Sequence, residues 1–379
     1  AIITKQSDGV WEISGVGVGG LHEPDTILDF GNSGTSTRLL LGCLAALEGY
    51  ASITGDASLC GRPMGRVLMP LRDMGIEYLA RAQDRLPLTI RGAGTELQAI
   101  DYRLPVASAQ VKSCLLLAGL HCRGTTRIVE PTPTRDHTER MLIQFGAEVE
   151  VCQEGDGTQI LLAGLQELQA TTVYVPGDPS SAAFVIAAAL IVPGSDIMVE
   201  NLSLNPGRIG FLQTLQEMGA DIVITPVTTI GEPAGNVRVR HSENLCGITL
   251  PASRAPSMID EYPILAVVAA YAKGTTCMQG LAELRVKESD RLAAIMEGLL
   301  ANGVLAREGD DWVEVQGGTL KGGGVVSTRL DHRIAMSFLI LGLRAQESVQ
   351  IDDADAIKTS FPNFVPVMEQ LGCVFVTKE

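Results

Sequence analysis

The chain has 379 residues, of which 46% are hydrophobic and 19% are charged. This balance is typical of globular proteins and excludes a disordered chain, which combines low hydrophobicity with high charge. With 29 Lys and Arg against 44 Asp and Glu, the formal net charge is −15, which argues against a nucleic acid or an anionic membrane surface as the main partner.

The eight cysteines are scattered and form no CxxC pair. In a chain of this size, that pattern predicts buried thiols of a reducing compartment and no zinc site. The longest apolar runs, Ala182–Pro193 and Tyr262–Ala272, are shorter than the roughly 20 residues that a membrane-spanning helix needs. We therefore expect a cytoplasmic protein.

In chain order, the first predicted elements are two strands joined by a turn, at Ala1–Thr4 and Val10–Ser14, and then a helix over Arg38–Leu47. Beyond them one pattern recurs: a helix with large apolar residues at three- and four-residue steps, a glycine, and strands such as Ala147–Cys152 and Ala220–Thr225. The glycine is expected to end each helix in the left-handed conformation. The recurring helices are Met64–Met74, Thr138–Phe145, Ile209–Met218, Asp290–Asn302 and Phe361–Leu371.

The glycines that follow these helices lie about 70–85 residues apart, so units of that length tile the chain. The strands at residues 1–14 match the end of such a unit, and we expect five complete units and part of a sixth. Six units suggest two domains of three, at residues 1–175 and 176–379, because Pro176 and Pro179 break a strand where Ser180 and Ser181 can cap the next helix. Alternating strands and helices favour an α/β fold.

Three polar segments precede predicted helices, where backbone amides and the helix dipole favour anions. Gly31–Ser36 is a hydroxyl-rich turn without the Gly-Lys-Ser/Thr of a P-loop. Arg135–Glu139 enters the second recurring helix, and Asp331–Arg333 opens an apolar helix. Each segment could hold a phosphate or a carboxylate, or be an ordinary turn or helix cap with exposed side chains.

The densest charged motif is Arg285–Leu292, in which Lys287 and Arg291 stand four residues apart. If this turn is already helical, the two cations share one face and can grip one anion, with Ser289 or Asp290 as the cap and Glu288 able to exchange a proton. The alternative is a solvated, salt-bridged helix start.

Asp260 lies ahead of the apolar run Ile264–Ala270, so we expect it at the edge of a core helix, as a cap or as a positioned base. No Ser-His-Asp, dinucleotide or HExxH signature accompanies it. Spacing alone therefore predicts a two-domain α/β protein with a cationic, anion-binding site and two candidate carboxylates, and it does not name a reaction.

Together these motifs resemble those of the 5-enolpyruvylshikimate-3-phosphate (EPSP) synthases, the 3-phosphoshikimate 1-carboxyvinyltransferases of aromatic amino-acid biosynthesis. The forms at Ser108–Lys112 and Arg135–Glu139 look like the second, bacterial class of this family, which includes glyphosate-tolerant members. The family fold has two domains, each of three βαβαββ units around a pseudo-threefold axis, and it matches the six-unit count. The resemblance spans the chain, through Leu28–Leu40, Gly55–Leu68, Ser108–Leu116, Arg135–Arg140, Pro176–Phe184, Arg254–Leu265, Leu284–Leu292, Leu330–Met336 and Ser360–Pro362.

The resemblance implies that phosphoenolpyruvate and shikimate 3-phosphate react to give the enolpyruvyl ether and inorganic phosphate, without a metal or an organic cofactor. The shikimate 3-phosphate is assigned to the first domain, and the acid and base to the second. The implied site residues are Ser108, Ala109, Gln110, Arg135, Asp260 and Lys287 for shikimate 3-phosphate, Arg62, Arg291 and Arg333 for phosphoenolpyruvate, and Asp260 and Glu288 for acid and base.

Three features depart from the family pattern. The family opens with a Gly-Asp-Lys-Ser-Ile-Ser-His-Arg-like segment that supplies a Lys, a Ser and an Arg to the site, and residues 1–379 do not contain it. We therefore expect this polypeptide alone to bind weakly and turn over little unless a separate N-terminal fragment completes it. Thr359 stands where another branch has a substrate-binding Lys, with Lys358 beside it. Gly34 stands where some tolerant members have Ala, so we expect more room for glyphosate as an inhibitor.

Two alternatives remain open at this point. One is the related UDP-N-acetylglucosamine enolpyruvyl transferase, although that family's usual catalytic Cys loop is not evident in the sequence. The other is a non-catalytic partner fragment, which folds but completes its site only with a second chain.

Overall fold

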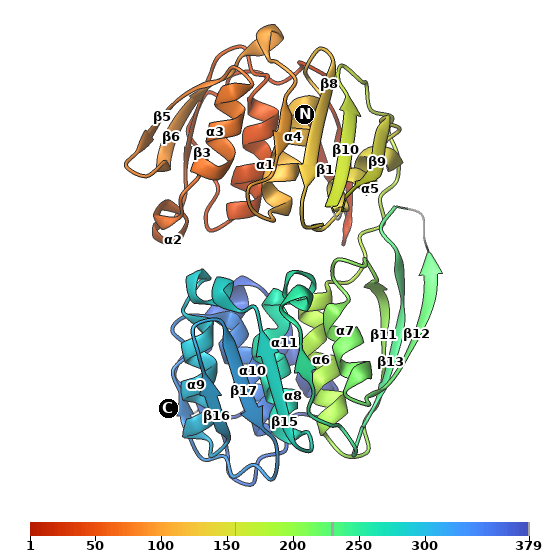
Figure 1. Cartoon of the computed structure of the whole chain (residues 1–379), viewed down its shortest axis with the longest axis vertical. Helices are drawn as coiled ribbons and strands as arrows, with labels where there is room; N and C mark the ends of the chain where they lie inside the picture. Colours follow the sequence, from red (N-terminus) through yellow and green to blue (C-terminus); the bar gives the residue numbers. More distant parts are fainter. Residues whose placement is uncertain (156, 229–230, 378–379) are drawn as a thin grey trace. The chain divides into compact units, whose positions relative to one another are not determined.

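The computed structural model describes residues 1–155, 157–228 and 231–377, and it divides into two compact units, Ala1–Val173 and Tyr174–Glu379 (Figure 1). We call these the first and the second unit. The predicted division between residues 175 and 176 falls two residues further on, in the same stretch of chain without helix or strand. The roles predicted for each half remain predictions.

The first unit contains two β-α-β-α-β-β repeats, each with one parallel strand pair and two antiparallel pairs. The strand orders are β3-β4-β6-β5 and β7-β8-β10-β9. The first repeat comprises β3 (Leu28–Asp29), α1 (Gly34–Leu44), β4 (Tyr50–Thr54), α2 (Ala57–Gly61), α3 (Gly65–Asp73), β5 (Glu77–Arg81) and β6 (Arg85–Arg91), and the single turn η1 (Gly94–Glu96) follows it. The second comprises β7 (Asp101–Arg103), α4 (Ala109–Gly119), β8 (Thr125–Glu130), α5 (His137–Gln144), β9 (Val149–Glu154) and β10 (Gly157–Ala163).

The second unit contains three further repeats, the last of which has no final strand pair among the described residues. Its first repeat has α6 (Pro179–Ile191), β11 (Asp196–Ser203), α7 (Gly210–Glu217), β12 (Asp221–Thr228) and β13 (Ala234–Arg240), with Gly177 bridged in parallel to Leu202 in place of a first strand. The next has β14 (Thr249–Leu250), η2 (Ala252–Ser257), η3 (Ile259–Glu261), α8 (Tyr262–Tyr271), β15 (Thr275–Gln279), η4 (Ala282–Val286), α9 (Arg291–Ala301), β16 (Leu305–Glu308) and β17 (Trp312–Gln316). The last has β18 (Val325–Val326), α10 (His332–Gly342), β19 (Gln350–Ile351), η5 (Asp355–Thr359) and α11 (Phe364–Gln370).

The strand–turn–strand predicted at the start of the chain is confirmed as the antiparallel hairpin of β1 (Ile2–Ser7) and β2 (Val10–Ser14). The five recurring helices are confirmed as α3, α5, α7, α9 and α11. The glycine after each helix has a φ between 80° and 116°, the left-handed region in which an absent Cβ removes the steric penalty.

Two predictions of helix starts were wrong, and in both cases an upstream residue caps the helix. The helix expected at Arg38 begins at Gly34, because the Ser33 side chain accepts the amide hydrogen of Ser36. Asp178, rather than Ser180 or Ser181, caps α6: its carboxylate accepts the amide hydrogens of both serines at 3.1 and 3.0 Å.

Two kinds of helix set where polar residues can lie. Helices α3, α5 and α7 bury one apolar face, whereas α6 and α8 are apolar on nearly all sides and pack against each other and against α10. Figure 1 shows the sheets β11–β13 and β15–β17 on separate sides of the helices of this unit. Helices α6, α8 and α10 each connect two parallel segments of their own repeat, and such crossovers share one handedness. The N-termini of these three helices therefore lie at one end of the unit. The charged motifs lie at that end.

Among the described residues, no helix combines the length and the hydropathy needed to cross a bilayer.

Candidate active site

In the second unit, the predicted site residues converge on Asp260, which lies in η3 directly before α8. The Lys287 Nζ lies 3.4 Å from the Asp260 Oδ1, and the Arg291 Nη1 lies 3.2 Å from the same oxygen. The Arg333 Nη1 donates to the backbone carbonyl of Asp260 at 3.1 Å. Four residues from three separate segments of the sequence therefore form one charged cluster.

Arg291 is the centre of this cluster and is only 1% exposed. Its Nε donates to the Asp331 Oδ2 at 2.8 Å, its Nη2 to the Glu288 Oε2 at 2.5 Å, and its Nη1 to Asp260. Burial disfavours its charge, but the carboxylates of Asp331 and Glu288 more than offset this and hold the pKa of Arg291 above its ordinary value. One guanidinium thus brings the two predicted acid/base carboxylates together.

Asp331 is fully buried and serves as both a helix cap and an ion-pair partner. Its Oδ1 accepts the amide hydrogen of Arg333 at 2.9 Å, and its Oδ2 accepts from the Ser289 hydroxyl at 3.1 Å. Burial would raise its pKa, yet the charge of Arg291 and the hydrogen bonds from the Arg291 side chain and the Arg333 amide hold the pKa of Asp331 below its ordinary value. The sequence allowed a helix cap with exposed side chains at Asp331–Arg333. Asp331 is indeed the cap, but His332 and Arg333 are partly buried. Burial and Arg333 lower the pKa of His332.

The condition for a shared helical face of Lys287 and Arg291, a turn that is already helical at Lys287, is not met. Helix α9 begins at Arg291 and is capped by Asp290, which accepts the amide hydrogen of Ala293 at 3.0 Å. Lys287 precedes the helix with an extended backbone. Both cations still contact one carboxylate, because η3 carries Asp260 to them.

Sequence reasoning missed Glu261, which is 1% exposed and lies between cations from two other repeats. Its Oε1 accepts from the Ser180 hydroxyl and lies 3.7 Å from the Arg333 Nη1 and 3.9 Å from the Arg208 Nη2. Arg208 in turn contacts Asp178 at 3.3 Å and the Ser180 hydroxyl at 2.8 Å. The sequence signal that could have identified Glu261 is its position as a carboxylate directly before the apolar helix α8.

In the first unit, the predicted residues gather at the N-termini of α1 and α4. Ser108 caps α4 by accepting the amide hydrogen of Val111 at 3.4 Å, and Ala109 is the first helical residue. The Gln110 side chain joins the two helices, because its Oε1 accepts from the Arg38 Nη1 at 2.8 Å and its Nε2 donates to the Thr35 Oγ1 at 2.9 Å.

Arg38 was not predicted, although it is 8% exposed and lies beside the site. Burial, together with repulsion from Arg66 and Arg62, lowers the pKa of Arg38 to about 10. The hydrogen bonds of Arg38 go to neutral oxygens. Those of Arg62 also go to neutral oxygens, on the side chains of Asn32 and Ser58, at 3.2 Å each. Within the described ranges no carboxylate lies at ion-pair distance from either arginine. These two cations therefore keep a net positive potential at a helix N-terminus, which suits an anion.

Gly34, at the start of α1, faces the same two arginines. A Cβ built on it would lie 3.1 Å from the Arg38 Nη1 and 3.4 Å from the Arg62 Nη1. The absence of a side chain at Gly34 therefore leaves room for the guanidinium groups. Arg135 lies in the loop between β8 and α5, directly before the cap residue Asp136.

The family is shown by comparison with known proteins. Residues 1–368 match the family model described as EPSP synthase (3-phosphoshikimate 1-carboxyvinyltransferase). The chain belongs to the EPSP synthase family. It is 56% identical over 380 residues to the 3-phosphoshikimate 1-carboxyvinyltransferase of Parvibaculum lavamentivorans, covering 99% of this chain and 84% of that protein. It is 55% identical to the enzyme of the same name from Rhizobium johnstonii, covering 97% and 83%.

Solved structures confirm the predicted enolpyruvyl transferase fold. The EPSP synthase from Acinetobacter baumannii superposes with a TM-score of 0.88 at 42% identity, over 97% of this chain and 84% of that one. The enolpyruvyl transferase NikO from Streptomyces tendae, at 15% identity and a TM-score of 0.63, shares the fold. The family match and the names of these relatives favour the EPSP synthase family over the UDP-N-acetylglucosamine enolpyruvyl transferase.

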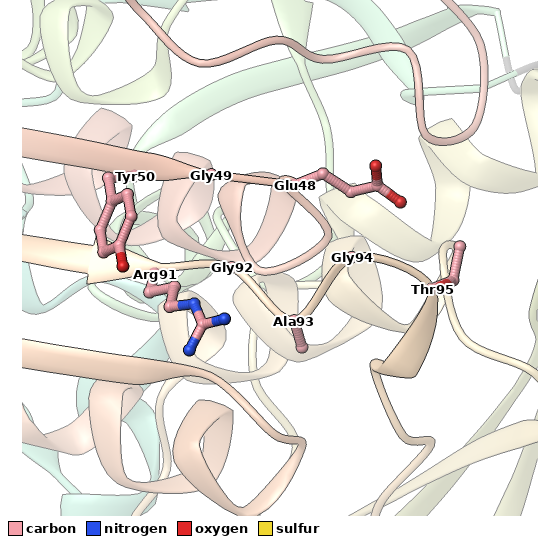
Figure 2. Close-up of a pocket in the computed structure, with 8 residues that line it drawn as sticks. All are labelled: Glu48, Gly49, Tyr50, Arg91, Gly92, Ala93, Gly94 and Thr95. Atoms are coloured by element: carbon pink, nitrogen blue, oxygen red, sulfur yellow. The ribbon is translucent and has the colours of Figure 1, made fainter.

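A separate cavity of about 340 Å³ lies near the other end of α1 and contains none of the predicted site residues (Figure 2). Its walls come from the start of β4 and the end of β6, where Tyr50 and Arg91 are cross-strand partners. The EPSP synthase motifs lie instead at the N-terminus of α1, so we do not assign the reaction to this cavity. No group of three or more His, Cys, Asp or Glu side chains within the described parts of the chain is arranged to hold a metal ion.

Proposed function

We propose that this chain transfers the enolpyruvyl group of phosphoenolpyruvate to the 5-hydroxyl of shikimate 3-phosphate and releases inorganic phosphate. The observation that carries the proposal is the buried cluster in which Arg291 contacts Asp260 and Glu288 at once. The family match and the relatives' names support the choice of substrates. The product supplies a shikimate-pathway step toward chorismate and the aromatic amino acids.

The reaction needs two matched proton movements. A proton adds to the methylene carbon of phosphoenolpyruvate while the shikimate hydroxyl gives up its own proton and bonds to the neighbouring carbon. The methyl group formed then returns a proton as the bond to phosphate breaks, which restores the methylene. Asp260 and Glu288 are the proposed acid and base, and their charges stabilise the cation-like centre between these steps.

The two units offer anions different electrostatic environments. In the second unit, Lys287, Arg291 and Arg333 are already paired with carboxylates or close to them, so a substrate anion has to compete with Asp260 and Glu261 for these cations. We assign phosphoenolpyruvate to Arg291 and Arg333, together with Arg62 of the first unit.

In the first unit, Arg62 and Arg38 hydrogen-bond neutral groups and remain available to a phosphate or a carboxylate. We assign shikimate 3-phosphate to Ser108, Ala109, Gln110 and Arg135, with Asp260 and Lys287 near its hydroxyls. The reaction calls for neither a metal ion nor an organic cofactor, because it exchanges only protons, a carboxyvinyl group and phosphate between two substrates.

Three finer assignments are part of the proposal. The Ser108–Lys112 and Arg135–Glu139 motifs support the second, bacterial class of the family. The eight cysteines, all free in the structure, support a cytoplasmic location. We also propose that glyphosate inhibits the enzyme. Whether residues 1–379 need the Lys-, Ser- and Arg-bearing opening segment, supplied as a separate N-terminal fragment, stays a prediction.

The test is turnover of shikimate 3-phosphate and phosphoenolpyruvate, followed by phosphate release and by mass spectrometry of the enolpyruvyl ether. The polypeptide is assayed alone and with a peptide carrying the family's opening segment. Asp260→Asn and Glu288→Gln should each lower turnover about 10²–10⁴-fold. The matched control Glu314→Gln, at a strand pair away from the cluster, should not. A folded protein that forms no product in either condition would refute the proposal.

A further inference from the structure

A buried ion triad in the first unit has no part in the proposed chemistry. Lys112 is 0% exposed, Glu130 is 2% and Glu139 is 4%. The Lys112 Nζ lies 2.9 Å from the Glu130 Oε2 and 2.6 Å from the Glu139 Oε1. Burying three charges is costly, and hydrophobic replacements are often at least as stable. Stability alone is therefore a weak explanation for the triad.

Each member of the triad comes from a different element. Lys112 lies in the first turn of α4, two residues after the last of the proposed substrate residues Ser108–Gln110. Glu130 is the last residue of β8, and Glu139 lies in the first turn of α5. The loop that carries Arg135 runs between these two glutamates. The triad therefore joins the two ends of that loop to the helix that carries the other substrate residues.

A further contact reaches into the loop itself. The Thr134 hydroxyl donates to the Glu130 Oε1, whereas Lys112 donates to the other carboxylate oxygen, Oε2. Thr134 is the residue before Arg135. A second link joins the same helices, because the Ser113 and Thr138 hydroxyls lie 2.6 Å apart. The loop is thus tied at its start, beside Arg135 and at its end.

We propose that Lys112, Glu130 and Glu139, acting through Thr134, are positioning residues that hold Arg135 in register with Ser108–Gln110. This inference rests on the proposed function, because it takes Arg135 as a ligand of shikimate 3-phosphate. A loop held in its bound geometry gives up less conformational freedom when the substrate arrives. Charge pairs with fixed geometry also restrict the register more than apolar contacts of the same size, which tolerate sliding.

The sharpest test changes only the contact that reaches the loop. Thr134→Val removes the hydroxyl, keeps the shape, and leaves all three charges of the triad paired. Titration calorimetry of the full chain with shikimate 3-phosphate should show a Kd about tenfold higher, with recovery in Thr134→Ser. The control Thr89→Val deletes a similar contact, to Ser52 at 2.9 Å, in the same unit but away from the site, and should bind normally.

Hydrogen exchange without ligand gives an independent readout. The amides of residues 132–137 should exchange faster in Thr134→Val than in the parent or in Thr89→Val. Faster exchange with an unchanged Kd would mean a structural tether and would overturn the positioning role, as would unchanged exchange with an unchanged Kd. A parent protein that binds no shikimate 3-phosphate, either alone or with the peptide carrying the opening segment, would overturn the proposed function and this inference with it. Normal binding that is insensitive to Thr134→Val overturns this inference alone.

Discussion

Replacement of Arg291 by Met tests whether this side chain holds the carboxylate cluster together. Arg291 contacts Asp331, Glu288 and Asp260, and Asp331 is as deeply buried as the arginine itself. Removing one partner of such a pair leaves an uncompensated buried charge, which costs about 3–5 kcal/mol. We expect Arg291→Met to lose that much free energy of unfolding at pH 7. Most of the loss should come from Asp331, because the other two carboxylates are partly exposed.

The pH dependence of this loss has a definite sign. In the parent, the pKa of Asp331 lies below its ordinary value of 3.8, so the pair stabilises the fold at pH 7 and loses this effect only as the pH falls below about 4. In Arg291→Met, the unpaired buried carboxylate has a raised pKa and sheds its penalty by binding a proton as the pH falls. The difference in stability between parent and variant should therefore be largest at pH 7 and narrow toward pH 4.

The assay can be confined to the second unit. The chain has two tryptophans, Trp11 in the exposed hairpin of the first unit and Trp312 in β17 of the second. In a Trp11→Phe background, urea unfolding followed by fluorescence reports the unit that contains Arg291. The control Arg307→Met breaks the solvent-accessible pair between Arg307 of β16 and Glu314 of β17, the strand that contains Trp312. This control should lower the free energy of unfolding by less than about 1 kcal/mol. A loss below about 1 kcal/mol for Arg291→Met, or one that is constant from pH 7 to pH 4.5, would refute the reasoning.

Two further predictions concern the first unit. Lys112→Met should destabilise the chain by about 3–5 kcal/mol in thermal or urea unfolding, because two buried carboxylates lose their cation, whereas Lys5→Met, at an exposed pair, should cost less than about 1 kcal/mol. Gly34→Ala should weaken inhibition by glyphosate roughly tenfold, because the new methyl group lies 3.1 Å from the Arg38 Nη1 and 3.4 Å from the Arg62 Nη1. Unchanged inhibition curves in a turnover assay would contradict this.

Local features of the fold were predictable from the sequence. The glycines after the recurring helices, such as Gly75 and Gly146, adopt positive φ values because the left-handed conformation is a steric matter within one residue. The Asp290 cap needs only an amide three residues away. The spacing of these signals also predicted the repeats, and the motifs predicted the family. Helix starts were less certain, because Ser33 and Asp178 competed with nearby residues for the same amides.

The charge pairing was decided by the tertiary structure alone. Arg291 was expected to clamp a substrate anion, but in the structure it contacts carboxylates from two other segments, Asp260 and Asp331. Lys112, to which the sequence analysis assigned no role, is fully buried between two glutamates. Whether a charge meets solvent or a buried partner depends on which repeats adjoin and on how much water is excluded between them. Sequence spacing therefore located the charged motifs, and packing determined which charges they meet.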